Sequence, residues 1–248
     1  DKVVLNKIRE TLMNAFGGEF SQIIIGGAPL NAEVEAFLRR IKFPVTVGYG
    51  MTETAPLISF TPWTDFRSQS CGQVLKGFMD ARIANPDMDG VGEIQVRGEN
   101  VMAGYYKNEQ ATKESFTADG WLRTGDLGII DKDGFIYIKG RCKTMLLGPS
   151  GQNIYPEEIE AKINNMPYVL ESLVLQKDTR LVALVCPDFE AVDADKLTQD
   201  QLEVVMEENR KLVNAELAAY EQINELRIYT HEFEKTPKKS IKRFLYEA

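Results

Sequence analysis

Residues 22–50, QIIIGGAPLNAEVEAFLRRIKFPVTVGYG, decide the fold class of this 248-residue chain. The β-branched run at 23–25 has the length of a buried strand and ends in two glycines. Asn31 is a candidate N-cap for the helix that follows it. Residues 45–47 predict a second strand, which again runs into glycine. A strand, a helix and a strand predict a βαβ unit, and therefore an α/β fold.

The rest of the chain changes pattern twice. Between about residues 68 and 141, short β-branched segments alternate with Gly, Asp and Asn, and Asp131-Lys132-Asp133-Gly134 forms a hairpin turn. This pattern predicts a small β-barrel or meander. A small α+β domain is expected after a boundary between residues 141 and 142. Its elements would be a helix starting at Pro156, two strands, a long acidic helix over 199–222, a last strand and a basic tail.

Composition excludes several classes of function. The net charge of −8, from 29 basic and 37 acidic residues, argues against sequence-independent binding of nucleic acid. A single histidine, His231, and three scattered cysteines argue against a zinc site or a Ser-His-Asp mechanism. Unpatterned thiols are typical of a reduced protein, so a cytoplasmic location is expected. No apolar stretch is long enough to span a membrane. The start at Asp1 rather than Met suggests a fragment or a processed chain.

Two glycine-rich strand ends are the first candidate site. If their strands pair, Gly26-Gly27-Ala28 and Gly48-Tyr49-Gly50 lie side by side. Ligands of open α/β sheets bind beyond the carboxyl ends of the strands. Glycine would let a flat ring approach the backbone, and Tyr49 would offer a stacking face. The alternative from the residues alone is a pair of tight turns with no ligand.

Three further groups of residues could carry chemistry. Thr52 could donate to a phosphate oxygen, and the carboxylate of Glu53 suits Mg²⁺ bound to that phosphate. Asp126 could accept both hydroxyls of a ribose, and Arg141 could reach the same sugar. Residues 148–153 form a glycine loop just past the boundary. Each has a structural alternative: an N-cap with a first-turn acid, turn-forming residues and a surface loop.

These motifs, in this order and spacing, closely resemble the adenylate-forming superfamily, which contains acyl-CoA synthetases, peptide-synthetase adenylation domains and beetle luciferases. The resemblance covers nearly the whole chain. Residues 26–30, and the stretch from Thr124 through Gly151 to Glu160, are most similar to the long-chain fatty acyl-CoA synthetase branch. The motifs that carry the superfamily resemblance are Gly48-Tyr49-Gly50-Met51-Thr52-Glu53-Thr54, Gly120-Trp121-Leu122-Arg123-Thr124-Gly125-Asp126 and Gly140-Arg141-Cys142-Lys143.

The resemblance implies a two-step reaction. A carboxylate attacks the α-phosphate of Mg-ATP to give acyl-AMP and pyrophosphate, and the thiol of coenzyme A then attacks the acyl carbon and releases AMP. Glu53 would hold Mg²⁺, and Thr52 would be catalytic through a hydrogen bond to the α-phosphate. The residues implied in nucleotide binding are Gly27, Ala28, Gly48, Tyr49, Gly50, Thr52, Asp126 and Arg141.

The resemblance also assigns the domains. Residues 1–141 would be the C-terminal part of the large nucleotide-binding domain, with a βαβ unit and then a small β-barrel. Residues 142–248 would be the small mobile C-terminal domain, with its hinge at Lys143. Ser150 and Gly151 would lie in a loop on the coenzyme A side.

The chain departs from the family pattern in two ways. The family's Ser/Thr/Gly-rich phosphate loop and most of its acyl pocket lie upstream, so the chain is expected to be a C-terminal half that is inactive alone. The family's closing motif ends Gly-Lys-Ile-x-Arg, and aligning Ile241 and Arg243 puts Ser240 in the position of the lysine. Lys239 and Lys242 flank it. If the segment is extended, Lys242 shares a face with Ser240, which favours Lys242 as the catalytic cation.

Two rival functions stay open. A ligase that loads a carrier protein instead of coenzyme A would share every nucleotide motif, and a non-catalytic nucleotide-binding module would explain Ser240. The expected substrates are ATP, a fatty acid and coenzyme A, with Mg²⁺ as cofactor and no nucleic acid partner. Peripheral membrane association, the acyl chain length and the oligomeric state are left open.

Overall fold

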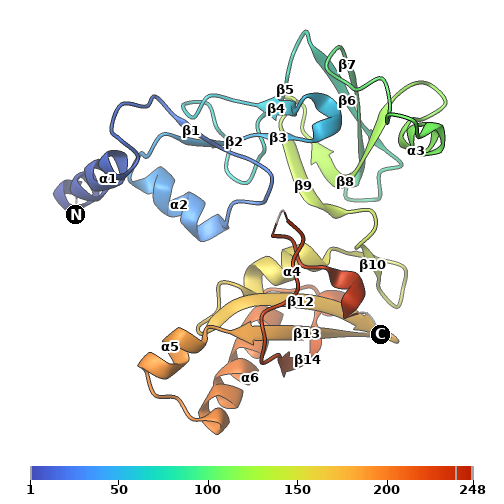
Figure 1. Ribbon diagram of the computed structural model, residues 1–248. Helices are drawn as coiled ribbons and strands as arrows, with labels where there is room; N and C mark the ends of the chain where they lie inside the picture. The colour runs from blue at the N-terminus through green and yellow to red at the C-terminus, as the bar shows by residue number, and fades with distance from the viewer. Residues whose placement is uncertain (1, 238, 247–248) are drawn as a thin grey trace. The chain divides into compact units, whose positions relative to one another are not determined.

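The structure is a computed structural model that describes residues 2–237 and 239–246 (Figure 1). The chain divides into two compact units, Asp1–Cys142 and Lys143–Ala248. In Figure 1 the first unit runs from blue to yellow-green and the second from yellow to red. The fold is mixed α/β, as predicted.

The first unit begins with the predicted βαβ arrangement. Helix α1 (Lys2–Ala15) is followed by strand β1 (Ile23–Ile25), helix α2 (Ala32–Arg40) and strand β2 (Val45–Val47). The two strands are parallel, with Ile25 opposite Val47. The N-cap prediction is confirmed, because the side-chain oxygen of Asn31 accepts hydrogen bonds from the backbone N–H groups of the first turn.

A three-stranded antiparallel sheet follows, formed by β3 (Tyr49–Gly50), β4 (Leu57–Phe60) and β5 (Gln73–Val74). A short 3₁₀ helix, Thr52–Thr54, lies between β3 and β4. Position 50 has to be glycine, since a Cβ there would lie 1.9 Å from the carbonyl oxygen of Pro56. The close approach lets β3 pair with β4 on either side of this 3₁₀ helix, with Gly50 opposite Leu57.

The β-rich segment forms an open meander. Strands β6 (Met79–Ala84), β7 (Gly92–Gly98), β8 (Leu122–Ile130) and β9 (Ile136–Arg141) make a four-stranded antiparallel sheet, and helix α3 (Glu109–Ser115) precedes β8. The predicted meander is confirmed.

The predicted barrel is wrong, since no ladder among the described residues joins β6 to β9. The start of β9 is instead bonded to the segment that carries β5. The backbone N–H of Cys71 donates to the carbonyl oxygen of Ile136 at 2.8 Å, and that of Ile136 donates to Gly72 at 3.0 Å. Closing the sheet into a barrel would need the backbone N–H and carbonyl groups of Ile136 at this edge of β9, and both are already hydrogen-bonded.

The second unit is built on a three-stranded sheet. Strand β12 (Val169–Lys177) pairs antiparallel with β13 (Arg180–Pro187), which pairs parallel with β14 (Ile223–Ile228). The remaining elements are the β10 (Leu146–Leu147) and β11 (Asn153–Ile154) hairpin, α4 (Pro156–Ile163), α5 (Phe189–Ala194), α6 (Gln199–Ala215) and two 3₁₀ turns, Ala219–Glu221 and Arg243–Leu245.

Both faces of this sheet are covered. Val174 lies in a cluster with buried residues of α4 and α6, such as Ile159 and Leu202. Its strand neighbours Leu173 and Leu175 lie in a second cluster with Phe233 of the tail. This alternation is the period of two that a strand imposes on its side chains.

The long helix was predicted to extend to residue 222, but α6 ends at Ala215. Asn214 accounts for the difference. Its side-chain amide donates to the carbonyl oxygen of Ile223 at 2.9 Å, and its side-chain oxygen accepts from the N–H of the same residue at 2.8 Å. These two bonds tie the end of the helix to the start of β14 and turn the chain.

Candidate functional site

The two glycine-rich strand ends lie side by side, as the sequence predicted. The N–H of Gly48 donates to the carbonyl oxygen of Ile25 at 2.9 Å. A Cβ at Gly26 would lie 3.2 Å from the carbonyl oxygen of Gly48. Gly27 has a φ of +85°, and both it and Ala28 are exposed. The edge therefore offers uncovered backbone that a flat ligand could approach.

Tyr49, Asp126 and Arg141 form one network. The hydroxyl of Tyr49 donates to Oδ2 of Asp126 at 2.7 Å, and Nη1 of Arg141 lies 3.3 Å from Oδ1. Burial raises the pKa of Tyr49, and the negative charge of Asp126 adds to the effect. Asp126 thus has a protonated phenol on one oxygen and a guanidinium on the other.

Tyr49 is 7% exposed, and its ring packs in a core cluster with residues such as Ile58 and Ile94. Little of the ring is therefore open to stacking. The contact that the structure shows is the hydroxyl bond to Asp126. Stacking of a base on Tyr49 stays a prediction.

The position of Asp126 follows from the sheet. Asp126 lies opposite Arg141 in the β8–β9 register. Its N–H donates to Oγ1 of Thr124, and the Thr124 hydroxyl donates to the carbonyl oxygen of Ile94 in the buried sheet at 2.7 Å. Gly125 has a φ of +70°, a conformation that favours glycine. The Thr-Gly-Asp motif therefore holds the carboxylate of Asp126 beside Arg141, at the last pair of the β8–β9 ladder.

Thr52 and Glu53 open the 3₁₀ helix at the end of β3. Thr52 is exposed, whereas Thr54 is buried and donates its hydroxyl to the carbonyl oxygen of Pro56 at 2.7 Å. Oε1 of Glu53 accepts a hydrogen bond from the hydroxyl of Tyr105 at 2.7 Å. That bond to Glu53 raises the pKa of Tyr105. Sequence reasoning missed Tyr105, because 52 residues separate it from its partner.

The carboxylate of Glu53 fits Mg²⁺ chemically. Mg²⁺ prefers oxygen ligands, and it is bound by one or two carboxylates together with water and the phosphates of a substrate. Within residues 2–237 and 239–246, the structure has no cluster of three or more His, Cys, Asp or Glu side chains able to hold a metal. An Mg²⁺ ion at Glu53 would therefore depend on a bound phosphate for further ligands.

The second unit carries the predicted hinge and loop residues. Lys143 is exposed at its start. Ser150 and Gly151 are exposed in the turn between β10 and β11, where the N–H of Gly151 donates to the carbonyl oxygen of Gly148 at 2.9 Å. The loop is therefore an ordered turn with its tip in solvent.

The two candidate tail lysines differ in their contacts. Nζ of Lys242 lies 3.1 Å from a carboxylate oxygen of Glu234. Lys239 is exposed with a φ of +61°, and no ion pair joins its side chain to another described residue. Because Lys239 lies in a turn, the alternation expected of an extended segment does not include it. Both lysines stay candidates.

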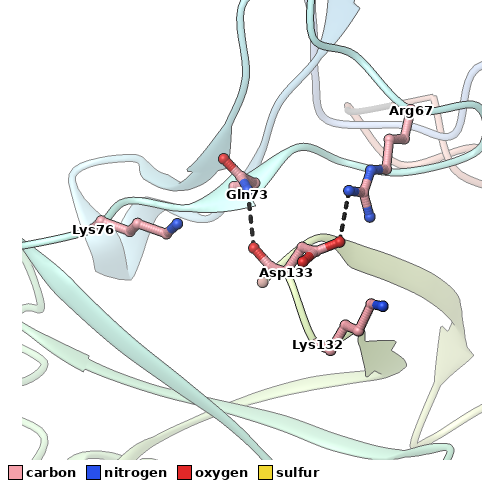
Figure 2. A pocket seen from close by; sticks show the side chains of 6 residues that line it. Arg67, Gln73, Lys76, Lys132 and Asp133 are labelled. Carbon is pink, nitrogen blue, oxygen red and sulfur yellow. Dashed lines mark hydrogen bonds and ion pairs between the residues drawn. The ribbon is translucent and has the colours of Figure 1, made fainter.

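The first unit also has an open hollow of about 550 Å³, lined by Arg67, Gln73, Lys76, Lys132, Asp133 and Gly134. Figure 2 shows Arg67 bound to Asp133, with Lys76 and Lys132 on either side. Arg67 also binds Asp131 at 2.7 Å, so much of its charge is compensated. None of the sequence-predicted site residues lines this hollow.

Comparison with known proteins shows which family the chain is similar to. Residues 4–106 match the model of the AMP-binding enzyme family. The chain is 32% identical to long-chain-fatty-acid–CoA ligase FadD15 of Mycobacterium bovis, over 98% of this chain and 42% of that protein. It is 34% identical to the ligase ACSBG1 of Bos taurus, over 82% of this chain and 28% of that protein. The chain therefore spans less than half the length of these relatives.

A solved structure gives the same fold. O-succinylbenzoate coenzyme A synthetase of Bacillus subtilis, in complex with ATP and magnesium ion, matches 95% of this chain and 49% of its own, with a TM-score of 0.72 and 25% identity. The family model and the shared fold both relate this chain to adenylate-forming enzymes. Residues 4–106 belong to the AMP-binding enzyme family, and the curated relatives named above, which the chain matches over most of its length, are long-chain-fatty-acid–CoA ligases.

Within the described residues, no helix is both long and apolar enough to cross a membrane.

Proposed function

We propose that this chain is the C-terminal part of a fatty acid–CoA ligase, which forms acyl-AMP from ATP and a fatty acid and then acyl-CoA. The observation that carries the proposal is the Tyr49–Asp126–Arg141 network, with its 2.7 Å and 3.3 Å contacts. A carboxylate held in this way is suited to accept hydrogen bonds from the two hydroxyls of a ribose. The names of the relatives support the acyl substrate and the coenzyme A acceptor.

Each predicted site residue of the first unit then has a role in binding ATP or in the reaction. Gly27, Ala28 and Gly48 frame the adenine at the strand-end edge, with Tyr49 and Gly50 at the start of the next strand. Asp126 and Arg141 hold the ribose. The exposed hydroxyl of Thr52 donates to the α-phosphate, where negative charge grows as the carboxylate attacks. Mg²⁺ at Glu53 would offset charge on the phosphates when bound.

The second unit supplies the mobile parts. Residues 142–248 act as a small domain that turns about Lys143 between the two half-reactions, and Ser150 and Gly151 lie on the coenzyme A side. A tail lysine brings a cation to the α-phosphate for adenylation. Lys242 would have to exchange Glu234 for phosphate, and an exposed ion pair of this kind is worth only about 0–1 kcal/mol. Lys239 needs no such exchange.

The first test uses the full-length protein that contains this chain. Incubation with ATP, Mg²⁺ and palmitate should release pyrophosphate, and added coenzyme A should give palmitoyl-CoA. Transfer to a carrier protein but not to free coenzyme A would establish the rival ligase. Binding of ATP with no pyrophosphate release from any fatty acid would establish a non-catalytic module.

The second test addresses the site. Asp126→Ala should weaken ATP binding tenfold to a hundredfold, since a hydrogen bond to a charged group is worth about 1.5–3 kcal/mol. If Asp126 only forms the turn, thermal stability should fall while ATP affinity stays normal. Lys242→Ala and Lys239→Ala, each assayed in both half-reactions, should show which lysine serves adenylation.

A further inference from the structure

The end of the tail is fixed to the second unit by a buried ion pair. Nη2 of Arg243 lies 2.5 Å from both carboxylate oxygens of Glu160 on α4, and Nη1 donates to the carbonyl oxygen of Val174 on β12 at 3.1 Å. The N–H of Val174 donates to Oε1 of Glu160 at 2.6 Å. Side-chain exposure is 15% for Arg243 and 12% for Glu160. One arginine thus joins the tail to a helix and a strand of the core.

The same cluster reaches the start of the unit. Glu157, one helical turn before Glu160, lies 3.8 Å from Nη2 of Arg243. Its Oε1 accepts a hydrogen bond from the hydroxyl of Thr144 at 2.6 Å. Thr144 directly follows Lys143, the proposed hinge. Two carboxylates and one guanidinium therefore link both ends of the second unit.

The chain before Arg243 forms a small hairpin. Ile241 is bridged to Lys235, and the N–H of Lys242 donates to the carbonyl oxygen of Glu234 at 2.9 Å. The hydroxyl of Tyr246 accepts a hydrogen bond from the N–H of Glu234 at 2.8 Å. The backbone of Lys242 is therefore held on one side by Glu234 and on the other by the anchored Arg243. Lys239 lies three residues before Lys242, in the turn of the same hairpin.

We propose that Arg243 is a positioning residue for adenylation, whose buried pair with Glu160 fixes the base of the tail hairpin and so the reach of the tail lysine. This inference rests on the proposed function and deepens it. Placement of a catalytic group is sensitive, since a shift of about 1 Å can change a rate about a hundredfold. Coenzyme A transfer needs no cation from the tail in the proposed mechanism. Losing the anchor should therefore impair adenylation alone.

The test uses the full-length protein and the double variant Arg243→Met with Glu160→Gln. Removing only the arginine would leave a buried carboxylate unpaired, which destabilises the fold by itself. The double variant removes both charges and keeps an acceptor for the N–H of Val174. We expect acyl-AMP formation to fall tenfold to a hundredfold. Thermal unfolding should shift by only a few degrees, and transfer from supplied acyl-AMP to coenzyme A should stay within about twofold.

A matched control is Arg227→Met with Glu225→Gln, which removes an exposed Arg–Glu pair of β14 whose N–O distance is 2.6 Å. It should leave both half-reactions unchanged. Arg243→Lys is a second variant, because lysine keeps the charge but cannot bind Glu160 and Val174 in the same fork geometry. It should lower adenylation by at least about threefold. This variant decides the question if the double variant does not fold.

The inference is overturned if the folded double variant adenylates normally or loses both half-reactions equally, or if Arg243→Lys adenylates as the wild type does. Each of these three results leaves the proposed function standing, provided that the wild type forms acyl-CoA. A wild-type protein that forms no acyl-AMP would defeat the proposed function itself.

Discussion

Residues 2–47 and the second unit contain similar amphipathic elements but differ in how they bury them. Helix α1 has no buried residue, and Val3, Val4, Phe16 and Ile24 are 53–81% exposed. Helix α6 buries Leu202, Met206 and Val213, and both faces of its sheet carry apolar clusters. The second unit therefore encloses a core of its own, whereas residues 2–47 leave several large apolar side chains exposed. Amphipathicity predicts the element, but burial depends on what packs against it.

The largest expected contrast is in independent folding. Residues 143–248 expressed alone should unfold in one cooperative thermal transition, because their core is complete within the unit. Residues 1–142 expressed alone should bind a hydrophobic dye and self-associate, because of their exposed apolar side chains. Circular dichroism and dye fluorescence measure the two properties. A monomeric, dye-negative 1–142 fragment with a sharp transition would break the comparison.

Single substitutions sharpen the contrast. Leu202→Ala should lower the unfolding free energy of the second unit by about 2–5 kcal/mol, since it opens a cavity at a side chain that is 2% exposed. Val4→Ala in α1, at a residue that is 60% exposed, should change stability by less than about 0.5 kcal/mol.

The matched control lies in α6 itself. Val204 is 59% exposed, so Val204→Ala should resemble Val4→Ala rather than Leu202→Ala. Urea unfolding followed by circular dichroism gives all three values. Equal losses at Leu202 and Val204 would mean that α6 does not pack as described.

Sequence patterns predicted local features well and distant contacts poorly. The Asn31 cap and the side-by-side glycines follow from a few neighbouring residues, and both are confirmed. The predicted end of α6 was wrong. The chain turns there because Asn214 forms two hydrogen bonds with Ile223, and the hydrophobic periodicity of the helix does not predict such contacts.

In the candidate site, too, the sequence predicted local motifs but not their distant partners. The Thr-Gly-Asp motif marked Asp126, but its bond to Tyr49 crosses 77 residues, and the Arg243–Glu160 pair crosses 83. Such pairs depend on which strands and helices meet. A motif shows that a charged residue has a role, and the fold shows which partner holds it.

The buried carboxylate of Glu160 should make the stability of the second unit depend on pH. Burial raises the pKa of Glu160 to about 7, with Arg243 opposing this shift and Glu157 reinforcing it. Between about pH 4.5 and pH 7 the folded state keeps a proton that the unfolded state releases. Stability of the 143–248 fragment should therefore fall by about 1–3 kcal/mol as pH rises through this window.

Glu160→Gln tests this assignment, because its amide stays neutral across the window. Urea unfolding at pH 5, 6 and 7 should give a flatter profile for the variant than for the wild type. A wild-type profile that rises with pH would show that Arg243 outweighs burial and that the sign is opposite.

The smallest expected effect separates two adjacent tyrosines of the first unit, which are both exposed but differ in their contacts. Tyr105 donates its hydroxyl to Glu53 at 2.7 Å, whereas Tyr106 is 88% exposed. A residue that orients a metal ligand improves metal affinity without touching the metal. In the full-length protein, Tyr105→Phe should raise the Mg²⁺ concentration for half-maximal acyl-AMP formation by about 2–10-fold, equivalent to about 0.5–1.5 kcal/mol. Tyr106→Phe should leave it unchanged, and thermal stability should stay within about 0.5 kcal/mol for both. An unchanged or lower Mg²⁺ requirement for Tyr105→Phe would show that the phenol does not orient Glu53 for the metal.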